Sequence, residues 1–240
     1  MRKVKTAIFP VGGLGTRFLP ATKSMPKEML PVANKPIIQY AYEEAKKAGI
    51  EKFIFITGRN KDAINNHFDH SYELEDKLDS DNRQSDYDKS SSWLPDPGKV
   101  IFIRQQQPLG LGHAVWCARD CIADDEPFAV ILADELIMNT ENQGNFLSQM
   151  IDLFNAKGSD SPVIGVDKVR SDQIDKYGRV MADIQHENRA INYCMFSKSG
   201  KYLEFSRVSS ISLTAASLRI HKYVFTPNSA AILAIAVPKL

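Results

Sequence analysis

The residues best suited to chemistry lie in a glycine-rich stretch near the amino end of the chain. Gly12 to Arg17, with the sequence GGLGTR, interrupts an apolar run that begins at Ala7. Glycines let the backbone turn sharply and approach a ligand closely, which leaves N–H groups free to face an anion. The first 27 residues also contain six Lys or Arg, among them Lys23 and Lys27, and no Asp or Glu. This combination predicts a polyphosphate site whose cations have no nearby carboxylate to neutralise them.

Two known phosphate-binding motifs do not fit this stretch. A Walker A loop needs the pattern G-x-x-x-x-G-K-[ST], which the sequence lacks. The Rossmann fingerprint needs a further glycine where Phe18 stands, and then a helix. Pro20, Pro26 and Pro31 instead predict an extended, irregular segment, because proline has no N–H group and disfavours helix before it. A purely structural glycine turn stays the alternative interpretation.

Two polar residues that follow later apolar runs could join the same site. Asp134 comes directly after the run 128–132, where a carboxylate suits a hard metal ion or a ribose hydroxyl. Gln105 follows the run 100–103 and offers a donor and an acceptor together, which suits the imide edge of a pyrimidine. The alternatives are an Asp that begins a turn and a solvated Gln. His113, at a helix start, suits capping or packing better than catalysis.

Alternating apolar runs and amphipathic segments indicate the elements that would position these residues. Strands are expected at 7–11, 53–57, 100–103, 128–132 and 163–166, and helices at 36–48, 62–68, 112–121 and 146–156. This βαβ alternation predicts an α/β fold with a Rossmann-like, doubly wound, mainly parallel (mixed) sheet and helices on both faces. Residues 69–92 are strongly acidic and predict a solvated helix followed by a mobile loop.

Length and composition narrow the class of protein. The 240 residues suffice for one large domain or two small ones, and the net charge of +1 favours neither nucleic acid nor an anionic membrane as a partner. Cys117 and Cys121 are spaced i, i+4, but no further Cys or His pair has metal-ligand spacing. The odd count of three cysteines fits a reducing compartment. The apolar runs are too short for a signal peptide or a membrane span, so the expected location is cytoplasmic.

The stretch GGLGTRFLPATKSMPKEMLP resembles the signature of bacterial UTP–glucose-1-phosphate uridylyltransferases, which belong to the sugar-nucleotidyltransferase superfamily. The resemblance extends from about Val4 to about Ala190. It implies transfer of a uridylyl group from UTP to glucose 1-phosphate, with Mg²⁺ as cofactor, giving UDP-glucose and pyrophosphate. A thymidylyltransferase is disfavoured by the sequences PKEMLP and GLGHA.

The resemblance also implies roles for individual residues. Arg17 and Lys27 would clamp the triphosphate as the catalytic residues, and Asp134 would bind Mg²⁺. Gln105 and Gly110 would read the uracil, and Gly178 would let the backbone lie against the sugar. The full set implied for substrate binding is Gly12, Gly13, Leu14, Gly15, Thr16, Glu28, Gln105, Gly110 and Gly178. The family's homo-oligomer contacts lie partly in a tail that this sequence lacks, which leaves the oligomeric state open.

The resemblance fails after about Ala190, which divides the chain into a matching part, 1–190, and an altered, truncated C-terminal part of the same domain, 191–240. Residues 191–240 hold one acidic and six basic residues, and the family's Glu-Lys-Pro motif, which binds the sugar phosphate, is absent. The pattern resumes briefly at Lys222 to Pro227, as a pair of compensating frameshifts would produce. The alternative function is therefore a UTP-binding, catalytically impaired or inactive remnant of such an enzyme.

Overall fold

The computed structural model describes residues 3–134, 136, 145–156, 163–165, 179–181, 190–191, 195–197 and 233–236. The strands are β1 (Thr6–Pro10), β2 (Pro31–Val32), β3 (Lys35–Pro36), β4 (Lys52–Thr57), β5 (Val100–Arg104), β6 (Phe128–Ile131), β7 (Val163–Gly165), β8 (Arg179–Met181), β9 (Ala190–Ile191), β10 (Met195–Ser197) and β11 (Leu233–Ala236). The α-helices are α1 (Ile37–Lys47), α2 (Asp62–His67), α3 (Tyr72–Ser80), α4 (Gln84–Ser91), α5 (Leu111–Trp116) and α6 (Phe146–Ala156).

A mixed sheet forms the centre of the molecule, with the described strands in the order β5-β4-β1-β6-β11-β7-β9. β1 pairs in parallel with both β4 and β6, and β4 pairs in parallel with β5. β11 is antiparallel to β6 and β7. The chain builds β1, β4 and β5 outward in one direction and then returns to place β6 on the other side of β1. The predicted mainly parallel, mixed sheet is confirmed, and its strand order reverses between β1 and β6.

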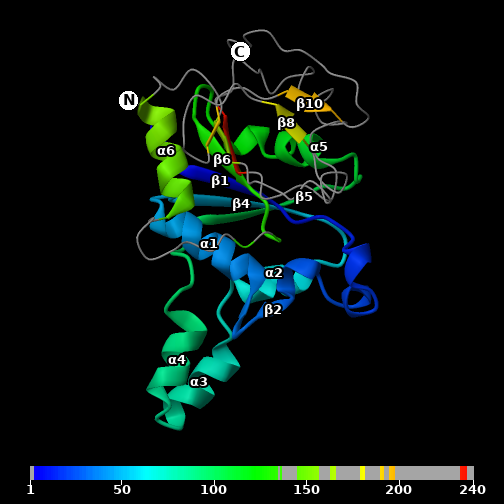
Figure 1. The fold of residues 1–240 in the computed structure, drawn as a ribbon. Helices are drawn as coiled ribbons and strands as arrows, with labels where there is room; N and C mark the ends of the chain where they lie inside the picture. Colours follow the sequence, from blue (N-terminus) through cyan, green and yellow to red (C-terminus); the bar gives the residue numbers. More distant parts are fainter. Residues whose placement is uncertain are drawn as a thin grey trace.

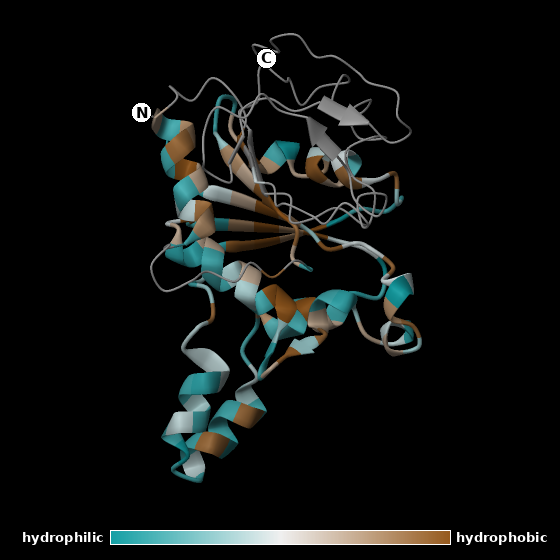
Figure 2. Ribbon diagram, viewed as in Figure 1, coloured by the Kyte–Doolittle hydropathy of each residue, from teal (hydrophilic) through white to brown (hydrophobic). Residues whose placement is uncertain are grey.

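Helices pack on both faces of this sheet, as a doubly wound fold requires (Figure 1). On one face, α1 and α6 cover a core that contains the aromatic side chains of Phe9, Phe55 and Tyr42. On the other face, α5 packs Ala114 and Val115 against the isoleucines of β1 and β4. Each large apolar side chain buried in this way stabilises the fold by roughly 1.5–3 kcal/mol. The strands are accordingly the most hydrophobic part of the ribbon in Figure 2.

The segment between β1 and α1 is irregular, as its prolines predict. It consists of the 3₁₀ turns η1 (Thr16–Phe18), η2 (Ala21–Lys23) and η3 (Lys27–Met29), followed by the short β2–β3 ladder. Each turn is closed by a backbone bond, such as the one from Phe18 N to the Gly15 carbonyl oxygen at 3.0 Å. The segment therefore has a defined path without an α-helix, and the Rossmann fingerprint is excluded by structure as well as by sequence.

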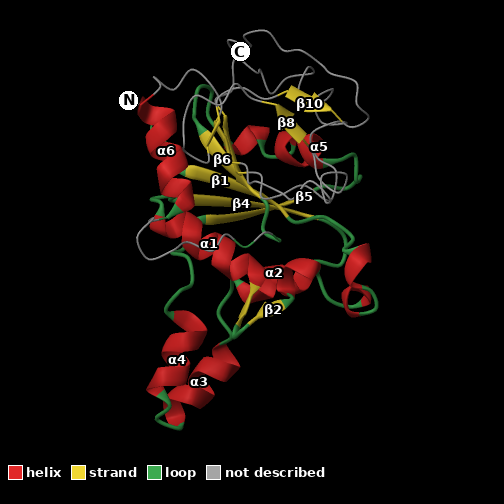
Figure 3. Cartoon of the chain, in the orientation of Figure 1, coloured by secondary structure: helices red, strands yellow, loops and turns green. Residues whose placement is uncertain are grey.

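Two expectations about helices were wrong. Residues 69–92 contain two helices, α3 and α4, which project away from the sheet as a hairpin, where a helix and a mobile loop were expected (Figure 3). Ion pairs one turn apart support α4, since Asp86 binds both Arg83 and Lys89. The helix expected at 112–121 ends earlier, at Trp116, and a separate 3₁₀ turn, η4 (Arg119–Cys121), follows it. None of the helices within the described residues is long and apolar enough to cross a membrane.

Candidate active site

Four chain segments meet at one edge of the sheet, and three of them carry predicted site residues. The glycine loop Gly12–Arg17 follows β1, Gly58 to Lys61 follow β4, Gln105 follows β5, and Asp134 lies three residues beyond β6. Because these four strands are parallel, their carboxyl ends share one edge. In doubly wound sheets ligands bind outside the carboxyl ends of the strands, where the strand order reverses. The reversal between β1 and β6 places the glycine loop and Asp134 at that position.

The glycine loop wraps closely around the side chain of Lys27. Gly15 has φ = 67°, in the left-handed region, and a Cβ atom there would lie 3.1 Å from Lys27 Cβ. A Cβ atom at Gly13 would lie 3.3 Å from Lys27 Cε. Thr22 fixes the turn by donating its hydroxyl to the Gly15 carbonyl oxygen at 2.6 Å. The loop thus needs glycine for both backbone conformation and close approach, while Gly13, Leu14 and Thr16 stay exposed.

Lys27 and Asp134, the predicted clamp and the predicted metal ligand, are in direct contact. Lys27 Nζ forms an ion pair and a hydrogen bond with Asp134 Oδ2, although 107 residues separate them in the sequence. The side chain of Asp134 is 36 % exposed and that of Lys27 is 21 % exposed, so both remain accessible from solvent. The expectation that the cations of this segment lack a neighbouring carboxylate was therefore wrong for Lys27. Arg17 is exposed and has no ion pair within the described part of the chain.

Beneath Lys27 lies a buried ion pair between Glu28 and Lys61. Lys61 Nζ lies 2.8 Å from Glu28 Oε2, and the two residues are only 6 % and 1 % exposed. Burial raises the pKa of Glu28, and the charges of Lys61 and Lys27 partly offset this effect. The other carboxylate oxygen, Glu28 Oε1, has no hydrogen-bond partner among the described residues. Glu28, implied by the resemblance to bind substrate, is thus held under the site, and Lys61 was not predicted to take part.

Gln105 has a fixed orientation beside the glycine loop. Its Nε2 atom donates to the Gly110 carbonyl oxygen at 3.0 Å and lies 3.0 Å from His113 Nδ1. Since a carbonyl oxygen only accepts, the amide nitrogen must face Gly110, and His113 Nδ1 must accept as well. Gln105 Oε1 is then directed toward Gly12, 3.4 Å from where a Cβ atom would stand. The two predicted base-reading residues are brought together, and His113, which the sequence left without a role, joins them.

The donor set at this edge fits a magnesium ion that arrives with a polyphosphate. No cluster of three or more His, Cys, Asp or Glu side chains with metal-binding geometry occurs among the described residues. Mg²⁺ commonly uses one or two protein carboxylates and completes its coordination with substrate phosphates and water. The exposed carboxylate of Asp134, next to the glycine loop, meets that requirement. Glu135 and Gly178 lie outside the described residues.

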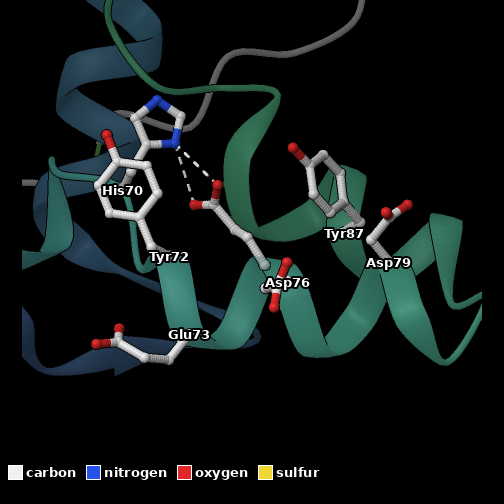
Figure 4. Close-up of a pocket in the computed structure, with 7 residues that line it drawn as sticks. His70, Tyr72, Glu73, Asp76, Asp79 and Tyr87 are labelled. Carbon is white, nitrogen blue, oxygen red and sulfur yellow. Dashed lines mark hydrogen bonds and ion pairs between the residues drawn. The ribbon is translucent and has the colours of Figure 1, made fainter.

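A separate cavity of about 690 Å³ lies in the α3–α4 hairpin (Figure 4). His70 is held there by the Glu75 carboxylate, with Nδ1–O distances of 3.0 and 3.1 Å. The lining is otherwise formed by Tyr72, Glu73, Asp76, Asp79 and Tyr87. None of the residues predicted to bind the nucleotide lines this cavity, and its carboxylates would repel a polyphosphate.

Comparison with known proteins shows the family to which the chain belongs. The nucleotidyl transferase family model matches residues 6–193. A UTP–glucose-1-phosphate uridylyltransferase of Bacillus subtilis is 43 % identical over 230 residues, which is 95 % of this chain and 73 % of that protein. A uridylyltransferase of the same name from Staphylococcus saprophyticus is 46 % identical over 178 residues, 74 % of this chain and 59 % of that protein. This chain thus spans between about three fifths and three quarters of the length of these relatives.

Solved structures give the same result. The UTP-bound UGPase of Acinetobacter baumannii superimposes with a TM-score of 0.73 at 32 % identity, covering 98 % of this chain and 74 % of that one. A UDP-glucose pyrophosphorylase complexed with UDP-glucose has a TM-score of 0.67 at 30 % identity and covers 98 % and 76 % of the two chains. The chain therefore belongs to the nucleotidyl transferase family, and within it to the UTP–glucose-1-phosphate uridylyltransferases.

Proposed function

We propose that this chain transfers the uridylyl group of UTP to glucose 1-phosphate, giving UDP-glucose and pyrophosphate. The observation that carries the proposal is the contact between Lys27 and Asp134 beside the glycine loop, at the point where the strand order reverses. A backbone cradle, a cation and a carboxylate in one place provide what a metal-bound triphosphate requires. The names of the relatives support uracil as the base and glucose as the sugar.

In this reaction a phosphate oxygen of glucose 1-phosphate attacks the α-phosphorus of UTP. A new P–O bond forms on that phosphorus, and its bond to the bridging oxygen of the β-phosphate breaks, so that pyrophosphate leaves. The attacking oxygen already carries negative charge at neutral pH, so the step needs no general base. Catalysis then consists of aligning two anions and of stabilising the charge that develops on the leaving pyrophosphate.

The site residues divide this work between them. The backbone of Gly13 to Thr16 offers N–H groups to the phosphate oxygens, and Lys27 and Arg17 neutralise their charge. Gln105 presents its Oε1 atom to the N3–H group of uracil, since its Nε2 atom is already used by Gly110 and His113. The carboxylate of Asp134 would hold Mg²⁺. When bound, this ion supplies charge neutralisation on the phosphates.

The test combines turnover with binding. UDP-glucose formation from UTP and glucose 1-phosphate is measured alongside the thermal shift that UTP produces with and without Mg²⁺. The expected result is turnover together with a shift that grows when Mg²⁺ is added. In Asp134→Asn the additional shift from Mg²⁺ should disappear, while the shift from UTP alone remains. A chain that neither forms UDP-glucose nor responds to UTP would refute the proposal.

One observation favours a second function, binding of UTP without transfer. Residues 191–222 contain no Glu-Lys-Pro motif, which binds the sugar phosphate in the family that the sequence resembles. The nucleotide half of the site does not depend on those residues, because its described members all lie before residue 135. A thermal shift with UTP and Mg²⁺ in the absence of UDP-glucose formation would favour this second function over the first.

A further inference from the structure

Four charged side chains form a line of alternating sign from the interior to the surface. Lys61 contacts Glu28, the carboxylate of Glu28 lies next to Lys27, and Lys27 contacts Asp134. The line starts with two buried residues and ends at the 36 % exposed side chain of Asp134. Its members come from three parts of the fold: the segment after β1, the end of the loop after β4, and the residues beyond β6.

One carboxylate oxygen of Glu28 has no hydrogen bond within the described part of the chain. Glu28 Oε1 is buried, has no hydrogen-bond partner among the described residues, and lies 4.0 Å from Lys27 Nζ. A buried carboxylate oxygen without a hydrogen bond is costly, and well-packed apolar side chains of similar size often replace buried ion pairs without loss of stability. Apolar side chains at these two positions would therefore stabilise the fold about as well as the ion pair does. Its position directly behind the Lys27 ammonium indicates a role in the site.

We propose that Glu28 and Lys61 are positioning residues for Lys27. Lys61 holds the Glu28 carboxylate, and Glu28 Oε1 is the second acceptor to which the Lys27 ammonium turns when Asp134 is engaged by the nucleotide's metal ion. The ammonium then stays charged and directed at the phosphates. This inference rests on the proposed function, because it assigns Lys27 to the triphosphate. It adds Lys61 and gives Glu28 a role other than contact with substrate.

The backbone shows why Lys61 can hold Glu28 firmly. Glu28 lies in the 3₁₀ turn η3, which is closed by the bond from Leu30 N to the Lys27 carbonyl oxygen at 3.1 Å. Lys61 is the residue before α2, and its carbonyl oxygen accepts from Ile64 N at 2.9 Å. The backbone of each residue is thus held by a turn. The ion pair then sets the distance between η3 and α2, and with it the place of Lys27.

The experiment removes the pair without leaving a buried charge. Lys61→Met alone leaves the buried Glu28 carboxylate without its hydrogen-bonded lysine, so the melting temperature should fall by roughly 10 °C. The double variant Glu28→Gln/Lys61→Met removes both charges and should recover most of that loss. Turnover of the double variant should nevertheless be about 10–100-fold lower, because small misplacements of a reacting group cost rates of this order. UTP affinity measured by calorimetry with Mg²⁺ should fall as well, and affinity measured in EDTA should fall less, because Lys27 then keeps Asp134 as its acceptor.

Coupling to Lys27 separates positioning from a general structural effect. In a Lys27→Ala background the Glu28→Gln/Lys61→Met change should lower neither turnover nor UTP affinity further, because its effect acts through Lys27. Equal losses in the presence and absence of Lys27 would overturn the inference. The matched control is Lys52→Met/Glu126→Gln, which removes an ion pair at the amino ends of the strands and should leave turnover unchanged.

The unchanged chain distinguishes failure of the inference from failure of the proposed function. If the unchanged chain turns over or binds UTP, and the Glu28→Gln/Lys61→Met variant does so equally well, the inference is overturned and the proposed function stands. If the unchanged chain neither turns over nor binds UTP, the proposed function fails, and the inference fails with it. Turnover and UTP affinity that fall together, only when Lys27 is present, support both.

Discussion

Gly58 and Gly12 pack against each other where β4 and β1 end. A Cβ atom at position 58 would lie 3.0 Å from the Gly12 carbonyl oxygen and 3.3 Å from its Cα atom. Both neighbouring atoms belong to the backbone, so neither can rotate away. The path of the glycine loop therefore depends on the residue that follows the adjacent strand, and the two loops cannot vary independently.

We predict that Gly58→Ala weakens nucleotide binding as well as the fold. The added methyl group pushes Gly12 away, at a cost of about 1–3 kcal/mol for overpacking, and moves the phosphate cradle with it. The KM for UTP should rise about tenfold. Gly49→Ala is the control, because Gly49 has φ = 88° and open space around it. This control should lose about 1–2 kcal/mol of stability and no activity. Equal KM values in both variants would contradict the prediction.

We predict that Lys27→Ala folds normally and loses most turnover. The ion pair with Asp134 is partly exposed, and such pairs contribute about 1 kcal/mol or less to stability. The loss of a charge that stabilises the transition state costs on the order of 10²–10³ in rate. Lys23→Ala is the matched control, since Lys23 is an exposed lysine in the same irregular segment. Steady-state kinetics and melting curves of both variants test this, and wild-type turnover in Lys27→Ala would refute the assignment.

The fold, and the grouping of the main candidate site residues at one edge of the sheet, could be predicted from the sequence because their signals are local. Apolar runs such as 53–57 mark buried strands, and the order of strands and helices fixes a doubly wound sheet. Glycines and cations near residue 15 predict a phosphate-binding loop, and the position of Asp134 after a strand predicts that it lies near that loop. The helix α4 was missed because its residues are polar on all sides, and ion pairs one turn apart left no apolar period to detect.

The supporting residues could not be predicted, because their roles depend on distant contacts. Lys61 resembles any lysine before a short helix until the fold places it 2.8 Å from Glu28, 33 residues earlier. Gly58 is an ordinary residue of a loop until β1 and β4 pair. The expected lack of carboxylates near Lys27 failed for the same reason, since Asp134 reaches it only when β6 lies beside β1. The spacing of residues along the sequence does not reveal the distances between side chains that the fold brings together.

We predict that His113 controls the affinity for UTP through Gln105. His113 Nδ1 accepts from Gln105 Nε2, so His113→Leu leaves that N–H without its partner and lets the amide turn. One lost neutral hydrogen bond corresponds to about 1–1.5 kcal/mol, or about tenfold in the KM for UTP, with little change in kcat. His113→Asn keeps an acceptor near the Nδ1 position and should restore the affinity. If Leu and Asn at this position behave alike, the hydrogen bond has no such role.

His67 packs between Gln39 and Trp93. His67 Nε2 lies 3.1 Å from Gln39 Oε1, and the imidazole stacks on Trp93 with a centroid distance of 4.7 Å. Burial lowers the pKa of His67 below its ordinary value of 6.5. As the pH falls through 6.5, the unfolded chain takes up a proton that the folded chain does not. The stability that His67 contributes is therefore complete above pH 6.5 and is lost below it.

At pH 5.5, one unit below the ordinary value, this loss is at most about 1.4 kcal/mol. Chemical denaturation of the wild type at pH 7.5 and 5.5 should show a larger decrease in stability than His67→Phe or His67→Gln. Phe keeps the stacking on Trp93, and Gln keeps a polar group near Gln39, but neither titrates in this range. The loss of the ionisable group is the one change that both variants share. If the stability of both variants depends on pH as strongly as that of the wild type, another residue causes the acid sensitivity.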